Sequence, residues 1–149
     1  MSTLYETDFY SWTQEQAAAL KKAARAKLNM PAPLDWENLA EEIESLGRSQ
    51  ESELESRYFR LLAHLLKWRH QPEQRSGSWR GTIIEQRSRL AKLLRQNPSL
   101  KPRRGEFFEE AYADARELAA GETGLPIGTF PEQPPWTIEQ AEDRGFWPD

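Results

Sequence analysis

The sequence of 149 residues contains no cysteine and no valine. Without cysteine the protein cannot form a disulfide, a thiolate zinc site or an iron–sulfur cluster, and it has no cysteine nucleophile. The longest apolar run, Ala17–Leu20, is far shorter than the apolar core of a signal peptide or a membrane span. We therefore expect a cytoplasmic protein that does not enter a membrane and whose fold rests on packing alone.

The lack of valine, with only five isoleucines against seventeen leucines, favours helices because strands prefer β-branched residues. No segment shows the alternation of apolar and polar residues that is typical of a strand. Most glycines and prolines gather in residues 31–33, 72–81, 98–105 and 121–135, as in connections between helices. The sequence predicts an all-α fold.

The spacing of apolar residues predicts five main helices and one short helix. They cover residues 8–27, 35–46, 54–70, 78–97 and 105–120, followed by 137–143. Asp8, Asp35, Ser78 and Thr137 are the expected N-caps, because their side-chain oxygens accept backbone N–H groups. Gly121 is the expected C-terminal stop of the fifth helix.

One boundary stays open at Gly47, which either ends the second helix or lies within one long helix that continues to His70. We favour two helices, or one helix with a kink. In both cases the prediction is a single all-α domain of residues 1–149. It is a helical bundle of four to five main helices with an extended C-terminal tail at about residues 121–149.

The apolar stripes also predict which side chains are buried. Those expected in the core are Leu39, Ile43, Leu61, Leu65, Ile83 and Leu90. Of the six tryptophans, Trp36, Trp68 and Trp79 lie on helical stripes and are expected in the core. Trp12, Trp136 and Trp147 lie nearer the chain ends, where they either close the bundle or contact a partner.

Several short segments occur together in a characteristic order. They are Tyr5–Trp12, Asp35–Gly47, His64–Trp68, Ser78–Arg80, Asn97–Leu100 and Phe130–Pro131. In these segments the chain resembles the bacterial family known as domain of unknown function 29 (DUF29), over nearly its whole length. The resemblance implies a helical fold in a bacterial protein and brings no catalytic residues. Members of that family often carry a cysteine after the late Phe-Pro pair, where this chain has Gln133.

The net charge of −4 hides a strong asymmetry along the chain. Residues 67–104 contain eleven Lys or Arg and two Glu, which gives +9, whereas residues 1–66 carry −4 and residues 105–149 carry −9. A basic segment interleaved with tryptophans is typical of proteins that bind nucleic acid, and the candidate phosphate contacts are Arg80, Arg87 and Arg95. The alternative, which we favour, is that this segment pairs with acidic helices of the same bundle.

In this second interpretation the acidic end of the chain neutralises the basic helix, because consecutive helices are usually neighbours. The expected pairs join Glu106, Glu109, Glu110 and Asp114 to the face that bears Arg87, Lys92 and Arg95, while Phe146 and Trp147 anchor the tail.

Arg57 and His64 are the candidate catalytic pair. Six residues separate them, as in helical ribonucleases of the HEPN type, where the histidine exchanges protons and the arginine holds the phosphate. The alternative is that His64 makes a hydrogen bond at the edge of the core. A carboxylate metal centre would use a Glu-x-x-His pair, which the sequence lacks, and we find no phosphate loop, dinucleotide loop or nucleophile elbow. We expect no metal and no cofactor.

Because no catalytic pattern outweighs its structural alternative, the sequence predicts a noncatalytic protein-interaction module with an unidentified partner. The alternative function is a nucleic-acid-binding protein or a HEPN-like ribonuclease that uses residues 67–104 together with Arg57 and His64.

Overall fold

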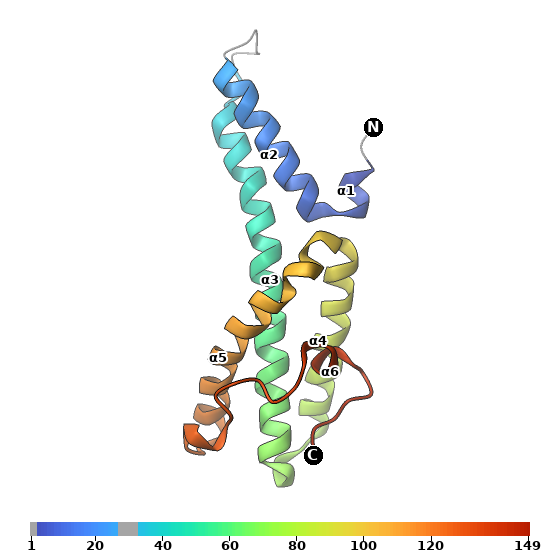
Figure 1. The fold of residues 1–149 in the computed structure, drawn as a ribbon, viewed down its shortest axis with the longest axis vertical. Coiled ribbons are helices and arrows are strands. Elements are labelled where there is room, and N and C mark those ends of the chain that lie inside the picture. The colour runs from blue at the N-terminus through green and yellow to red at the C-terminus, as the bar shows by residue number, and fades with distance from the viewer. Residues whose placement is uncertain (1–2, 27–32) are drawn as a thin grey trace. The chain divides into compact units, whose positions relative to one another are not determined.

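The computed structural model describes residues 3–26 and 33–149, and in these ranges it contains helices and no strand. The long helices are α2 (Phe9–Ala26), α3 (Trp36–His70), α4 (Gly77–Gln96) and α5 (Arg104–Thr123), shown in Figure 1. The short ones are α1 (Leu4–Thr7) and α6 (Ile138–Glu142), with 3₁₀ turns at η1 (Pro72–Gln74), η2 (Pro98–Arg103) and η3 (Ile127–Thr129). The predicted all-α class is confirmed. The expected end of the first helix at residue 27 lies outside the described residues.

Three of the four expected N-caps are confirmed. Asp8 Oδ1 accepts the backbone N–H of Ser11 at 3.2 Å, and Asp35 Oδ1 accepts that of Asn38 at 3.2 Å. Thr137 forms a complete capping box with Gln140 before α6. These motifs were predictable because each is a contact between residues three positions apart.

The two remaining boundary predictions are wrong by a few residues. Helix α4 begins at Gly77 rather than Ser78, because the Ser76 Oγ atom accepts the N–H of Trp79 at 3.1 Å. Helix α5 continues past Gly121 and ends at Gly124, whose φ of 75° lies in the left-handed region that glycine tolerates best.

Gly47 does not end a helix, because α3 runs through it without interruption. A Cβ atom at this position would lie 2.6 Å from Thr13 Oγ1 and 2.9 Å from Gln14 Nε2. The glycine therefore permits a close approach of α2 to α3. The predicted break at Gly47 is wrong, and the alternative of one long helix that continues to His70 is confirmed.

The contacts divide the chain into two compact units. The hairpin unit consists of Met1–Ser52 and Leu94–Lys101, and the bundle unit consists of Glu53–Leu93 and Pro102–Asp149. The expectation of a single domain for residues 1–149 stays a prediction, and each unit is described by itself below.

In the hairpin unit, α2 runs alongside the first half of α3 in the opposite direction (Figure 1). The two helices meet along small buried residues, Thr13 and Ala17 on α2 and Ala40 and Gly47 on α3, which we call the contact line.

The end of α4 completes this unit. The buried Asn97 accepts the backbone N–H of Tyr10 at 2.9 Å and donates to Gln50 at 3.1 Å. Asp8 accepts both the N–H and the hydroxyl of Ser99, at 3.0 and 2.8 Å. These hydrogen bonds connect residues about ninety positions apart in the sequence.

Two of the six predicted core residues lie in the hairpin unit, and neither is buried. Leu39 is 40% exposed and Ile43 is half-buried, while Leu46 on the same stripe is 47% exposed. The prediction was wrong here because the contact line uses the neighbouring small residues.

The bundle unit holds the large buried side chains. Leu61, Leu65, Ile83 and Leu90 are at most 1% exposed, as predicted. They are accompanied by Leu54, Tyr58, Leu62, Leu66, Phe108, Ala111 and Tyr112.

The tail packs on this core. Phe130 and Trp136 are 1% and 6% exposed, and the hydroxyl of Tyr112 donates to the carbonyl of Pro131 at 2.6 Å. Tyr58, which is fully buried, donates to Glu142 at 2.6 Å. The C-terminal segment thus belongs to the bundle.

Candidate functional site

Arg57 and His64, the predicted catalytic pair, lie on the bundle part of α3, and each contacts a residue one turn earlier on the same helix. The guanidinium of Arg57 pairs with Glu53 at 2.6 Å and donates to Gln86 at 3.3 Å. His64 Nδ1 lies 2.8 Å from the carbonyl oxygen of Arg60, and burial lowers the pKa of its imidazole. Within the described ranges no hydrogen bond joins the two side chains. Their role in RNA cleavage stays a prediction.

The basic segment forms a stack with two tryptophans in the bundle unit. The guanidinium of Arg75 lies 4.9 Å from the ring centre of Trp68, and that of Arg80 lies 5.2 Å from Trp68 and 4.9 Å from Trp147. Arg87 lies 5.4 Å from Trp147, and the two rings are 4.8 Å apart. Cations therefore cover the rings that a nucleic-acid base would need for stacking.

The three predicted phosphate contacts have different surroundings. Arg87 is only 2% exposed and donates to the carbonyls of Ala141 and Phe146 at 2.8 and 2.7 Å, and burial lowers its pKa. Arg80 is exposed above the tryptophan rings. Arg95 is exposed and belongs to the hairpin unit. In this structure Arg87 thus uses its donors to hold the tail.

The predicted pairing between acidic residues of α5 and the basic face of α4 is wrong for Glu106, Glu110 and Asp114. Glu106 pairs with Arg103 on the preceding turn at 3.6 Å. Burial, followed by the carboxylates of Glu110 and Asp114, raises the pKa of Glu55 on α3, so these two groups of α5 act on an acidic neighbour. The tail provides the cross-links instead, with Glu142 3.3 Å from Arg104.

The expected anchoring of the tail by its last aromatic residues is confirmed. Trp147 contacts Trp68, and the ring of Phe146 meets that of Trp136 edge-on at 6.2 Å. Gln133, which stands where DUF29 members often have cysteine, lines a shallow hollow with Glu109, Pro134 and Trp136.

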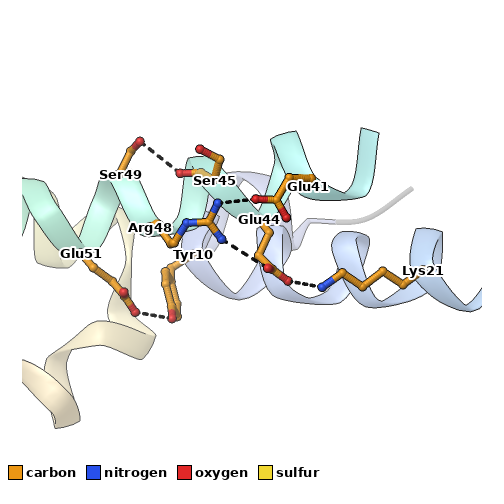
Figure 2. Close-up of polar contacts among 8 residues, drawn as sticks. All are labelled: Tyr10, Lys21, Glu41, Glu44, Ser45, Arg48, Ser49 and Glu51. Atoms are coloured by element: carbon orange, nitrogen blue, oxygen red, sulfur yellow. Dashed lines mark hydrogen bonds and ion pairs between the residues drawn. The ribbon is translucent and has the colours of Figure 1, made fainter. Parts of the chain in front are cut away.

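On one side of the hairpin, charged side chains of α2 and α3 form ion pairs with one another, as Figure 2 shows. Lys21 of α2 pairs with Glu44 of α3 at 2.6 Å, and this contact is the main reason why the pKa of Glu44 is lowered. Arg48 lies 2.8 Å from Glu41 and 3.3 Å from Glu44.

The other side of the hairpin is apolar. A residue that precedes a contact-line residue by one, such as Trp12 before Thr13 or Leu46 before Gly47, lies about 100° to one side of it. Because the helices run in opposite directions, this is the same side of the hairpin for both. We call it the apolar face; it consists of Phe9, Trp12, Leu20, Leu39, Ile43 and Leu46.

Nothing in the described ranges covers this face completely. Its residues are half-buried except Leu39 and Leu46, which are 40% and 47% exposed. Tyr5 of α1, 55% exposed, meets the edge of Trp12 at 4.8 Å beside it. An exposed row of large apolar side chains is typical of a surface that binds another molecule.

The sequence analysis missed this face because it assigned Leu39 and Ile43 to the core. One signal could have revealed it: α2 carries Thr13, Ala17 and a run of further alanines, which are too small to cover a full leucine stripe. Among the described residues no group of three metal-ligating side chains comes together, and no helix is long and apolar enough to cross a membrane.

Comparison with known proteins agrees with this architecture. The model of the family "Domain of unknown function DUF29" matches residues 4–147. The chain belongs to the DUF29 family. The chain is also similar to the crystal structure of an α-helical protein of unknown function from Rhodospirillum rubrum, at 27% identity and a TM-score of 0.76. That match covers 95% of this chain and 90% of the other, whereas a search of curated proteins gives no match.

Proposed function

We propose that this protein is an interaction module that binds a basic amphipathic helix of another protein on the apolar face of its hairpin unit. The observation that carries the proposal is that Leu39 and Leu46, two leucines of the apolar face, are exposed. A buried leucine is worth about 1.5 to 3 kcal/mol relative to an exposed one, so a partner that covers both gains substantial binding energy.

The shape of the face fits a helix. A pair of antiparallel helices leaves a groove between them, and a third helix that lies in the groove completes a three-helix arrangement. From Leu39 to Leu46 the face extends over seven residue steps, which is about 10 Å or two turns of a partner helix. That is the length over which an amphipathic helix presents residues at i, i+3, i+4 and i+7.

The charges around the face favour a basic partner. Glu6, Glu15 and Glu42 are exposed, and none of them has an ion pair among the described residues. By contrast, Lys21 and Arg48 are paired on the opposite side of the hairpin. Lysine or arginine beside the apolar stripe of the partner would meet these carboxylates and would raise the association rate and specificity.

The test uses a synthetic peptide of about 18 residues with leucines on one helical face and lysines elsewhere. Binding is measured by fluorescence anisotropy, and the contacted side chains by NMR of leucine and isoleucine methyl groups. We expect shifts at Leu20, Leu39, Ile43 and Leu46. Leu39→Ser combined with Leu46→Ser should weaken binding at least about tenfold, which is 1.4 kcal/mol.

The matched control is Ile84→Ser, because Ile84 is 50% exposed but lies on α4 in the bundle unit. An equal loss of affinity in this control would contradict the proposal. So would a protein that is dimeric without peptide and becomes monomeric in the double variant, since a second copy would then be the occupant. Mixed RNA serves as the probe of the alternative function, and cleavage abolished by His64→Ala would favour it.

A further inference from the structure

A pocket of about 290 Å³ lies at the end of the apolar face, within the hairpin unit. It is lined by Tyr5 and Glu6 of α1, Phe9 of α2, Gln50 of α3, and Gln96 and Asn97 at the end of α4. Gln50 lies on the same side of α3 as Leu46, one helical turn further along. The pocket is therefore a continuation of the apolar face.

Aromatic rings form one wall of the pocket. Tyr5 meets Phe9 at 5.8 Å and Trp12 at 4.8 Å, both edge-on, and Phe9 stacks with Trp12 at 5.8 Å. Tyr5 is 55% exposed, so its ring does not serve as core. A face of an aromatic ring carries partial negative charge and attracts cations.

The rest of the pocket lining is polar. Asn97, which is fully buried, accepts the backbone N–H of Tyr10 and donates to the carboxamide oxygen of Gln50, which holds that carboxamide in place. The side chains of Glu6 and Gln96 have no hydrogen-bond partner among the described residues. The pocket thus brings the carboxylate of Glu6 and the carboxamide of Gln96 together with aromatic rings.

We propose that this pocket binds the guanidinium group of an arginine side chain. The carboxylate of Glu6 attracts a cation and repels a phosphate, which excludes the polyanion that the basic segment suggested. A guanidinium is planar and always charged, so it can stack on Tyr5 or Phe9 while its N–H groups donate to Glu6 and Gln96. The volume accommodates one such side chain and little more.

This inference deepens the proposed function, because an arginine at one end of the partner helix would be anchored while its apolar stripe covers Leu39 and Leu46. The pocket is tested without any helix, so the two proposals can fail separately. The probe is N-acetyl-L-arginine amide, which carries a single guanidinium charge. N-acetyl-L-citrulline amide has the same shape without the charge and is the control ligand.

Binding is followed by NMR of the side-chain carboxamides of Gln50, Gln96 and Asn97. We expect saturable shifts with the arginine probe and none with the citrulline control. Glu6→Gln should raise the dissociation constant at least about fivefold, since it removes the charged acceptor. Glu37→Gln, an exposed carboxylate of α3 outside the pocket, should leave it unchanged.

Three results would overturn the inference. These are equal shifts with the citrulline control, an equal loss in Glu37→Gln, or shifts that spread over the surface without saturation. N-acetyl-L-lysine amide provides the last comparison, and binding as tight as that of the arginine probe would contradict recognition of a planar guanidinium. If the arginine probe binds but the helical peptide does not, the pocket stands and the proposed function fails.

Discussion

The hairpin unit and the bundle unit are both helical, but they are closed by side chains of different size. In the bundle unit Leu61, Leu65 and Tyr112 are at most 1% exposed, and Phe130 and Trp136 of the tail are buried as well. In the hairpin unit the contact line between α2 and α3 consists of glycine, alanine and threonine. The large side chains of the hairpin lie beside this line and are open to a partner.

The same contrast holds for charged residues. The bundle unit uses Arg87, which is 2% exposed, to bind two carbonyls of the tail. The hairpin unit uses exposed pairs, such as Arg48 with Glu41, whose side chains are 51% and 57% exposed. Exposed pairs contribute little to stability. The bundle unit therefore has a packed core, whereas the hairpin unit leaves large apolar side chains such as Leu39 and Leu46 exposed.

The largest expected effect comes from truncating matched leucines in the two units. Leu61→Ala should lower the free energy of unfolding by about 2 to 5 kcal/mol, because it opens a cavity in a packed core. Leu39→Ala should cost less than about 1 kcal/mol, because the side chain is already 40% exposed. Urea denaturation followed by circular dichroism measures both. Equal costs would show that the hairpin has a core of its own.

The comparison of Leu61 with Leu39 also shows what could be predicted from the sequence. Helices and caps were predictable because they depend on residues three or four positions apart, as at Asp35 and Thr137. The burial of Leu61 followed from a stripe that large residues on α4 and α5 cover. The exposure of Leu39 did not, because it depends on the small side chains of α2, which lie more than twenty positions away.

The candidate site was hidden for the same physical reason. Gly47 carries no signal of its own, and only the approach of Thr13 shows why a glycine stands there. The pocket joins Glu6 to Gln96 through contacts that no local pattern encodes. The basic segment was recognisable from its composition, but its use in holding the tail depends on Trp147, some sixty positions further on.

The second comparison sets the tail against the hairpin. Trp147→Ala removes a ring that contacts Trp68, Arg80 and Arg87, and it should lower the free energy of unfolding by about 2 kcal/mol. It should also make the tail more sensitive to limited proteolysis. Trp12→Ala on the apolar face is the control and should cost less, since its partners are themselves half-exposed. A larger loss of free energy of unfolding in Trp12→Ala than in Trp147→Ala would show that the hairpin unit, and not the bundle unit, depends more on its aromatic contacts.

The third comparison uses two glycines inside helices. Gly47→Ala should lower the free energy of unfolding by about 1 kcal/mol, because its Cβ atom would press on Thr13, whose hydroxyl is bonded to the carbonyl of Tyr10 at 2.6 Å. Gly81→Ala, on an exposed position of α4 with open space around it, should raise it by about 0.5 to 1 kcal/mol. Thermal unfolding of both variants shows whether each substitution stabilises or destabilises the protein. Stabilisation by both would mean that α2 does not pack closely on α3.

The smallest expected effect is a dependence on pH that comes from the bundle unit, because both histidines lie there. Burial lowers the pKa of His64 and of His70, so the folded state binds fewer protons than the unfolded state near pH 6.5. Stability should therefore fall as the pH drops through about 6.5. Each unit of difference between the folded and unfolded pKa is worth about 1.4 kcal/mol.

Denaturation between about pH 5.5 and 7.5 measures this fall. Glu55 acts in the opposite direction at more acidic pH, because burial and the neighbouring carboxylates raise its pKa above the ordinary glutamate value. His64→Gln combined with His70→Gln should flatten the dependence, because these are the only side chains in the chain whose ordinary pKa lies inside the window. A dependence that survives in the double variant would place its source in the carboxylates, including those of the hairpin unit, and the bundle unit would lose this distinguishing property.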